Sequence, residues 1–291
     1  MVGSYKIAVA SGKGGVGKTA LSLLLFKYLQ EVVPEPVSLV DCDVEEPNVS
    51  LFLDDSNLVE QIDACQDIPQ IDLNKCNFCK KCTEYCEFNA ITMVAASKFV
   101  EVNKNLCHSC GACEYACSNH AIQFSPEPIG KLSYNRSAIG NFYEGRLKIG
   151  SVMQTRLIKL LKEWGPHEGV VVYDAPPGTS CPVVETLDES DFVILVGEPT
   201  PFGLHDMKLV IKVLELMNVP FGVVINKCDF GDEIMCNYLH DNSIEILGKI
   251  PYDQEFAKSY SEGRILESVP KYIENEVQKI AASIKFKRLY Q

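Results

Sequence analysis

Two sets of cysteines with the same spacing are the first residues in this chain whose types and positions point to chemistry. The chain has 291 residues and 13 cysteines, and eight of these cysteines fall in the short segment from Cys76 to Cys117. The first set is Cys76, Cys79, Cys82 and Cys86, and the second set repeats its spacing at Cys107, Cys110, Cys113 and Cys117. Thiolates spaced this closely bind soft metals, so the sequence indicates a metal-binding unit built from two copies of one motif.

Each set reads Cys-x2-Cys-x2-Cys-x3-Cys, the spacing of bacterial ferredoxins that carry two 4Fe-4S clusters. In that pattern the fourth cysteine of each set binds the cluster of the other set. Structural zinc prefers two separated pairs of ligands, which makes zinc the weaker interpretation. The usual proline after the fourth cysteine is Glu87 in one set and Ser118 in the other, but the ligands are complete. We expect one cluster on Cys76, Cys79, Cys82 and Cys117 and the other on Cys107, Cys110, Cys113 and Cys86.

A glycine-rich segment near the N-terminus has the spacing of a phosphate-binding loop. Residues 11–19 read Ser-Gly-Lys-Gly-Gly-Val-Gly-Lys-Thr and satisfy Gly-x-x-x-x-Gly-Lys-Thr. The glycines let backbone N–H groups turn toward phosphate oxygens, Lys18 supplies charge to the β- and γ-phosphates, and the Thr19 hydroxyl can ligate Mg²⁺.

The same glycines also spell the dinucleotide fingerprint Gly-x-Gly-x-x-Gly. Two observations count against that alternative. A Lys-Thr pair has no role under a pyrophosphate, and Asp41 lies farther beyond Gly12 than the roughly 20 residues at which a ribose-binding acid is found. Phosphoryl chemistry is therefore favoured.

The run Lys-Gly-Gly-x-Gly-Lys-Thr at residues 13–19 resembles the deviant Walker A motif of the MinD, ParA, Mrp and nitrogenase iron-protein superfamily. Residues 41–48 are similar to its switch I, and residues 172–179 to its Walker B motif and switch II. Asn226-Lys227-Cys228-Asp229 is similar to its base-recognition segment, and residues 248–253 to its final nucleotide-contacting loop. The resemblance covers the chain outside the cysteine-rich segment.

The resemblance implies a role for individual residues. Lys13 would reach across an ATP-dependent homodimer to the partner's ATP and act in catalysis with Lys18, and Asp43 would orient the attacking water. Asp41 and Asp174 would hold Mg²⁺ together with Thr19. The implied ATP contacts are Gly12, Lys13, Gly14, Gly15, Val16, Gly17, Lys18, Thr19, Ala20, Asn226 and Pro251. These assignments suit phosphoryl transfer, which needs cations and a positioned nucleophile more than covalent help.

Alternating strands and helices must position these residues. Short apolar runs typical of buried parallel strands lie at residues 6–10, 37–41, 169–173, 192–197, 221–225 and 244–250. Residues 21–32 and the apolar stripes at 153–161 and 204–214 indicate helices between them. We expect a doubly wound, mostly parallel α/β sheet with an inserted small α+β ferredoxin-like domain. The expected division is 1–65, the insertion 66–126, and 127–291.

Composition and the pattern of the first residues bear on the partners and the cellular location of the protein. A net charge of -12 disfavours nucleic acid as a partner. The first residues lack the pattern of a signal peptide, and no apolar run approaches the roughly 18 residues of a membrane span. These features predict a cytoplasmic protein without stable membrane insertion, where abundant cysteines favour metal or redox chemistry over disulfides.

Three functions fit these features. The first is an ATP-hydrolysing dimer switch coupled to electron transfer through the clusters to an unidentified redox or metallocofactor protein. The second is an ATP-dependent carrier or assembly factor for iron–sulfur or other metallocofactors. The carrier scaffolds of the Mrp type have a C-terminal Cys-x-x-Cys pair that is absent here. The third, a MinD-like positioning ATPase, ranks last. Cys181, seven residues after Asp174, is a weaker candidate for a subunit-bridging cluster ligand.

Overall fold

The computed structural model describes residues 4–228 and 231–289, and the side chains up to residue 284. The chain divides into two compact units. The large unit comprises Met1–Ile62, Leu132–Arg146 and Ile158–Gln291, and the small unit comprises Asp63–Lys131 and Leu147–Leu157. The small unit thus contains the segment 66–126 singled out by the sequence and, in addition, residues 147–157. The division at residues 65 and 126 into independently folding domains stays a prediction.

A sheet with a parallel centre forms the frame of the large unit. Within the described residues it has nine strands in the order β11-β10-β9-β1-β8-β2-β7-β6-β3. The pairs from β11 across to β7 are parallel. The strands are β1 Tyr5–Ser11, β2 Val37–Asp41, β3 Asn57–Ile71, β6 Ile122–Arg136, β7 Asn141–Leu147, β8 Val170–Asp174, β9 Phe192–Gly197, β10 Phe221–Asn226 and β11 Ile246–Ile250. This confirms the expected α/β fold with a mostly parallel sheet.

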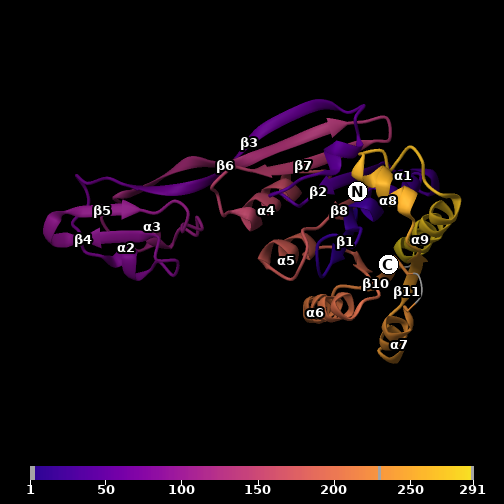
Figure 1. Ribbon diagram of the computed structural model, residues 1–291. Helices are drawn as coiled ribbons and strands as arrows, with labels where there is room; N and C mark the ends of the chain where they lie inside the picture. The colour runs from indigo at the N-terminus through magenta and orange to yellow at the C-terminus, as the bar shows by residue number, and fades with distance from the viewer. Residues whose placement is uncertain (1–3, 229–230, 290–291) are drawn as a thin grey trace. The chain divides into compact units, whose positions relative to one another are not determined.

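Helices cover both faces of this sheet. Figure 1 shows α1 and α9 on one side of the strands and α5 and α6 on the other. The helices of the large unit, with α4 shared between units, are α1 Lys18–Val32, α4 Gln154–Trp164, α5 Cys181–Leu187, α6 Pro201–Met217, α7 Glu233–Asp241, α8 Gln254–Ser261 and α9 Lys271–Leu289, with a 3-10 turn η1 at Val49–Phe52. Among the described helices, none is both long and apolar enough to cross a lipid bilayer.

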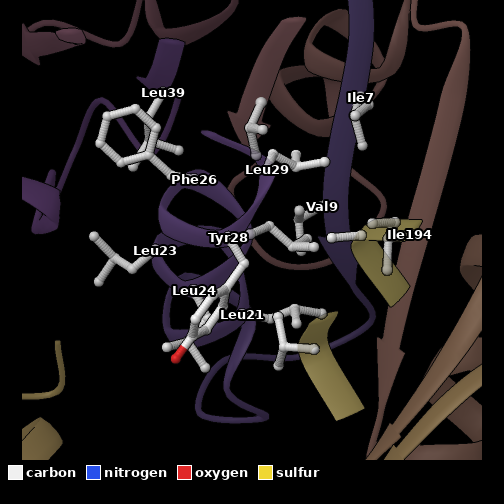
Figure 2. Close-up of a cluster of buried hydrophobic side chains, with 14 of the residues drawn as sticks. Ile7, Val9, Leu21, Leu23, Leu24, Phe26, Tyr28, Leu29, Leu39 and Ile194 are labelled. Carbon is white, nitrogen blue, oxygen red and sulfur yellow. The ribbon is translucent and has the colours of Figure 1, made fainter. Parts of the chain in front are cut away.

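The main core lies between α1, α9 and the sheet. Figure 2 shows Leu21, Leu24 and Tyr28 of α1 beside Val9 of β1 and Ile194 of β9. Alternate residues of β1 point into this cluster, and α1 is buried along most of its length. β1 has a parallel strand on each side, and α1 packs against this part of the sheet. This packing fixes the loop between β1 and α1, which is the phosphate-binding segment.

The small unit is built from two copies of one short motif. Its elements are α2 Lys81–Glu84, β4 Ile91–Val94, η2 Ala95–Ser97, β5 Phe99–Val102 and α3 Ala112–Tyr115. The helices α2 and α3 begin at equivalent positions of the two cysteine sets. Left-handed backbone also recurs at equivalent positions, at Phe78 and Ser109, at Lys80 and Gly111, and at Asn89 and His120. The sequence repeat is therefore also a repeat of backbone conformation.

Several elements differ from the sequence prediction. The first helix begins at Lys18, three residues before the apolar run at Leu21, because the phosphate-binding loop itself turns into the helix. The last strand begins at Ile246, because Ser243 is left-handed and the Ile244 N–H is bonded to Leu239 in a turn after α7. The strands β3, β6 and β7 are not predicted, since their buried and exposed residues follow no simple apolar run.

Candidate functional site

The glycine-rich loop lies between the end of β1 and the start of α1. Gly17 precedes the helix with a φ of 93°, and Gly15 has a φ of 75°, both in the left-handed region that glycine favours. A Cβ on Gly12 would lie 2.5 Å from the backbone carbon of Asp206 in α6. The backbone favours glycine at Gly15 and Gly17, and the close approach of Asp206 requires it at Gly12, so the loop has the form needed to direct N–H groups at phosphate.

A pocket of about 330 Å³ opens over this loop and brings together most of the predicted nucleotide contacts. This volume falls at the lower end of the range of small-molecule sites. Its lining includes Lys13, Gly14, Gly15, Gly17, Lys18, Thr19, Ala20, Asp43, Asn226 and Pro251 from the predicted set. Gly12, Val16, Asp41 and Asp174 do not line it. Val16, Asp41 and Asp174 are buried.

Asp174 anchors the first turn of α1. Its carboxylate accepts hydrogen bonds from Lys18 Nζ at 2.9 Å, Thr19 Oγ1 at 2.7 Å and Ser22 Oγ at 2.8 Å. Burial disfavours the charged form of Lys18, but the carboxylates of Asp174, Asp41 and Asp43 together outweigh it and raise the pKa of Lys18 above its usual value. The oxygen donors at Thr19 and Asp174 are those that Mg²⁺ prefers.

Asp41 lies opposite Asp174 where the parallel strands β2 and β8 pair. It is completely buried, and its oxygens accept the backbone N–H groups of Asp43, Asn48 and Val49 at 2.9–3.0 Å. The carboxylate thus fixes the turn between β2 and η1, which carries Asp43 to the pocket. Its predicted role as a Mg²⁺ ligand stays a prediction, since in this structure its described partners are backbone amides.

The buried position of Asp41 leads to a pH prediction. Burial, together with the nearby charge of Asp174, raises the pKa of Asp41 to about 7, above an unfolded value near 4. The folded state therefore binds the Asp41 proton more tightly, and this contribution to stability is present at low pH and is lost as the pH rises toward about 7. The thermal midpoint of the nucleotide-free protein should fall between about pH 5 and about pH 8. An Asp41→Asn variant should show a smaller fall, and an unchanged slope in that variant would contradict the assignment.

Lys13 is held by its own subunit in this structure. Its Nζ lies 2.9 Å from Glu198 Oε1, and Lys227 Nζ lies 3.3 Å from Glu198 Oε2 and 2.9 Å from the carbonyl oxygen of Gly15. Although burial opposes ionisation, the two lysines hold the pKa of Glu198 below its usual value. The action of Lys13 across a dimer stays a prediction, and it would require Lys13 to leave Glu198.

The far end of the pocket is built from the segments after β10 and β11. Asn226 Nδ2 donates to the Val16 carbonyl at 2.6 Å, and Asp253 caps α8 by accepting the Phe256 N–H at 2.7 Å. Phe256 and Tyr260 of α8 line the pocket, and the Tyr260 ring packs 4.8 Å from that of Phe52 in η1. Asp229, the last residue of the predicted base-recognition segment, lies outside the described residues.

Sequence reasoning missed Glu198, Lys227, Asn48 and Tyr260 as pocket or loop-anchoring residues. Glu198 directly follows β9, and the carboxyl ends of parallel strands meet at one edge of a sheet. That position was a usable signal for Glu198. Lys227 lies within the base-recognition segment, but that motif by itself gives no role to this lysine. Tyr260 carries no signal in sequence, because only the packing of α8 brings it to the loop.

The small unit brings the cysteines together in two groups of four. One small cavity is lined by Cys76, Cys79, Cys82 and Cys117, and another by Cys86, Cys107, Cys110 and Cys113. Each cavity therefore takes three thiols from one copy of the motif and one from the other. This is the grouping that the ferredoxin spacing predicts.

Backbone hydrogen bonds explain why the copies exchange their fourth cysteine. The Asp72 N–H, before the first set, donates to the Ala121 carbonyl after the second at 2.8 Å, and the Asn103 N–H donates to the Ala90 carbonyl at 2.7 Å. The beginning of each copy is thus tied to the end of the other. The fourth thiols, Cys86 and Cys117, each accept a backbone N–H four residues on at 3.3 Å.

Across the described part of the chain, no three or more His, Cys, Asp and Glu side chains are placed to hold one metal ion. The cysteines that bind a 4Fe-4S cluster each reach a different iron, so they lie farther apart than four ligands of one zinc. Four thiols around an apolar cavity fit a cluster by the chemistry of the donor set. The ligand assignment itself stays a prediction.

Cys181 is exposed and is the first residue of α5, at the end of the switch II segment. Within the described residues the remaining cysteines are scattered and form no disulfide. Cys42 is fully buried, and burial raises the pKa of its thiol above the usual range. The bridging role considered for Cys181 stays a prediction.

The loop, the pocket and the parallel sheet together define a P-loop nucleotide-binding protein. The sequence pattern of the CobQ/CobB/MinD/ParA nucleotide binding domain matches residues 7–266, and the chain belongs to that family. P-loop proteins of the MinD and ParA type generally hydrolyse ATP and typically dimerise.

Relatives and solved structures agree with this assignment. Two uncharacterized proteins of Methanocaldococcus jannaschii are each 32% identical to this chain, one over 94% of it and 96% of the relative, the other over 96% and 94%. A Pyrococcus furiosus protein named iron-sulfur cluster carrier protein is 24% identical over 86% of this chain and 74% of its own length.

Two solved structures share the fold. MinD of Pyrococcus horikoshii with Mg-ADP has a TM-score of 0.57 at 19% identity, covering 97% of this chain and 96% of that one. The cell division ATPase MinD of Pyrococcus furiosus also has a TM-score of 0.57, at 20% identity, covering 97% and 99%. At this identity the likeness concerns the fold alone.

Proposed function

We propose that this protein is a dimeric ATPase whose nucleotide state controls electron transfer through two 4Fe-4S clusters in the small unit. The observation that carries the proposal is the presence, in one chain, of a phosphate-loop pocket and two cavities each lined by four thiols. A cluster, when bound, supplies reversible one-electron chemistry. The protein residues bind the nucleotide and determine when an electron is transferred.

The residues of the pocket divide the work of hydrolysis. Lys18 and the loop amides hold the phosphates, and Thr19 and Asp174 supply oxygens for Mg²⁺. Asp43 orients a water whose oxygen bonds to the γ-phosphorus as the bond to the β–γ bridging oxygen breaks, giving ADP and phosphate while the water proton passes to phosphate or solvent. Lys13 leaves Glu198 and neutralises charge on the partner's ATP.

An Asp43→Ala variant tests this division. The side chain borders the pocket, and the backbone of Asp43 is held by Asp41, so the substitution leaves the turn in place. Nucleotide affinity should stay within a fewfold of the parent, whereas steady-state hydrolysis should fall about 100-fold. Titration with a fluorescent nucleotide and a phosphate-release assay measure the two quantities. Turnover equal to that of the parent would remove Asp43 from the mechanism.

The course of the chain can couple the nucleotide pocket to the cysteine-rich unit. The turn that carries Asp43 continues through η1 into β3, and β3 runs from Asn57 to Ile71, just before the first cysteine set. Phe52 of η1 packs on Tyr260, which lines the nucleotide pocket. A nucleotide-dependent movement of this turn therefore acts directly on the strand that enters the cysteine-rich unit.

Carriage of iron–sulfur clusters is the second candidate function. It is favoured by the name of the Pyrococcus relatives, iron-sulfur cluster carrier protein, at 24% identity. In that case the ATPase cycle would drive handover of a labile cluster to an acceptor protein. The two complete sets of four cysteines favour resident clusters, because a fully ligated cluster is released slowly.

A redox titration separates the two candidates. The anaerobically reconstituted protein is titrated with EPR detection, once with Mg-ADP and once with a non-hydrolysable Mg-ATP analogue. A nucleotide-dependent shift in the potential of either cluster supports ATP-gated electron transfer. Identical potentials, together with ATP-dependent transfer of iron and sulfide to an apo-ferredoxin, would instead establish the carrier function.

A further inference from the structure

The two copies of the cysteine motif differ in the lysines that lie among their first three cysteines. Lys75, Lys80 and Lys81 lie among the cysteines of the first set, and the equivalent positions of the second set hold Leu106, Gly111 and Ala112. From residue 73 to residue 83 the chain carries three lysines and no acidic residue, with Asp72 before this segment and Glu84 and Glu87 after it. The equivalent segment, 104–114, carries one lysine and one glutamate. Since the backbone of the copies is alike, the contrast lies in the side chains.

These lysines lie close in sequence to an exposed cysteine of the first cavity. Cys79, between two of the cysteines that line this cavity, is exposed, and the next two residues are Lys80 and Lys81. Lys81 itself lines the cavity. Lys75 precedes Cys76, and its backbone carbonyl accepts the side-chain amide of Asn119 at 3.1 Å. The three lysines thus form a basic collar, which is the name used below for Lys75, Lys80 and Lys81.

Two of the three collar lysines form no ion pair within the described residues, although Glu84 lies in the same short helix as Lys81. Lys75 has a distant ion pair, 3.8 Å from Asp72, and its side chain is 53% exposed. Lys80 and Lys81 are exposed and form no ion pair with any residue that the structure describes. By contrast, Lys104 beside the second set is held 2.7 Å from Glu127. Two lysines without an ion pair among the described residues, beside one thiol site of a chain with net charge -12, indicate a surface for an anionic partner.

We propose that the collar is the docking surface for a small acidic protein that carries one electron at a time, such as an acidic iron–sulfur or flavin protein. This inference rests on the proposed cluster chemistry. The carrier docks on the collar and passes one electron to the cluster held by Cys76, Cys79, Cys82 and Cys117. The carrier is oxidised by one electron and the cluster is reduced by one, and no bond is made or broken.

Screening makes the local charge decisive. At physiological ionic strength the Debye length is about 8 Å, so the partner responds to the collar rather than to acids on distant parts of the chain. Complementary charge of this kind raises association rates by about tenfold or more and loses its effect at high salt. The exposed Cys79 places the redox centre next to the collar, where the path for the electron is short.

The test is the rate at which a reduced acidic ferredoxin reduces the reconstituted protein, followed by stopped-flow absorbance. The Lys80→Glu/Lys81→Glu variant should reduce this second-order rate constant at least tenfold at low ionic strength, and the difference should shrink as salt is added. Lys98→Glu is the control, because Lys98 is exposed in the turn between β4 and β5, away from the cysteines in sequence. It should stay near the parent rate.

A charge-conserving variant sharpens the test. Lys81→Ala combined with Ala112→Lys moves one charge from the first copy to the matching position of the second and leaves the net charge unchanged. The rate should still fall severalfold, because the position of the charge matters. Rates insensitive to all these changes, or binding of a single-stranded oligonucleotide that depends on the collar while electron transfer does not, would overturn the proposal.

Iron content and reduction by dithionite are measured on every variant first. If the parent protein holds no clusters, the proposed function fails, and this inference fails with it because it rests on the clusters. If the clusters form and accept electrons from dithionite but the carrier rate ignores the collar, the proposed function stands and only this inference is wrong.

Discussion

Replacing Lys18 with alanine is expected to lower the affinity for Mg-ATP and Mg-ADP at least about 100-fold, because a buried cation that binds phosphate is removed. Lys18 is 7% exposed and lies 2.9 Å from Asp174 at the base of the phosphate loop. Without it, the negative charge of the buried carboxylates of Asp174 and Asp41 beneath the first turn of α1 is no longer offset by this lysine. Isothermal titration with ADP measures the loss.

Two companion variants make this result interpretable. Lys27→Ala removes another lysine of the same helix. Lys27 Nζ donates to the Leu266 carbonyl, and Lys27 does not line the pocket, so this variant should keep parental affinity. Lys18→Ala leaves Asp174 without its cation, which destabilises the fold. Lys18→Ala/Asp174→Asn removes the unpaired charge and should recover thermal stability without recovering affinity. Tight binding by a folded Lys18→Ala protein would refute the phosphate-loop assignment.

Removing cysteines in pairs is expected to show whether each cluster takes its fourth ligand from the other cysteine motif or from its own. If the cavities define the sites, Cys76 and Cys117 serve one cluster and Cys86 serves the other. The Cys76→Ala/Cys117→Ala variant should then drop from about eight to about four irons per chain and keep one EPR signal. The Cys76→Ala/Cys86→Ala variant touches both clusters and should lose nearly all iron, although it removes two cysteines of a single sequence motif.

Cys65→Ala is the matched control for the cysteine pairs. Cys65 lies in β3, within the small unit but outside both cavity linings, and its loss should leave the iron content unchanged. The opposite pattern, in which the pair from one motif loses one cluster and the pair from two motifs loses both, would show that each motif holds its own cluster. Equal losses in both pairs would mean that the two sites form only together.

Local spacing in the sequence was sufficient to predict which residues gather at the phosphate loop and at the two thiol-lined cavities. The glycines and Lys-Thr of the loop must be contiguous, because successive backbone amides and the first turn of one helix do the binding. The cysteine triplets are likewise local. Short apolar runs predicted the central parallel strands, since strands buried on both faces leave that pattern.

Contacts between distant segments were decided only by the tertiary structure. Glu198 meets Lys13 because β9 pairs with β1, and Tyr260 reaches the loop because α8 packs on η1. The strands β3 and β6 escaped prediction because each is long, partly exposed and paired with neighbours far along the chain. The exchange of Cys86 and Cys117 depends on backbone bonds that tie the ends of the two copies together. A sequence motif specifies which groups are present, whereas long-range strand pairing and helix packing determine which of them meet.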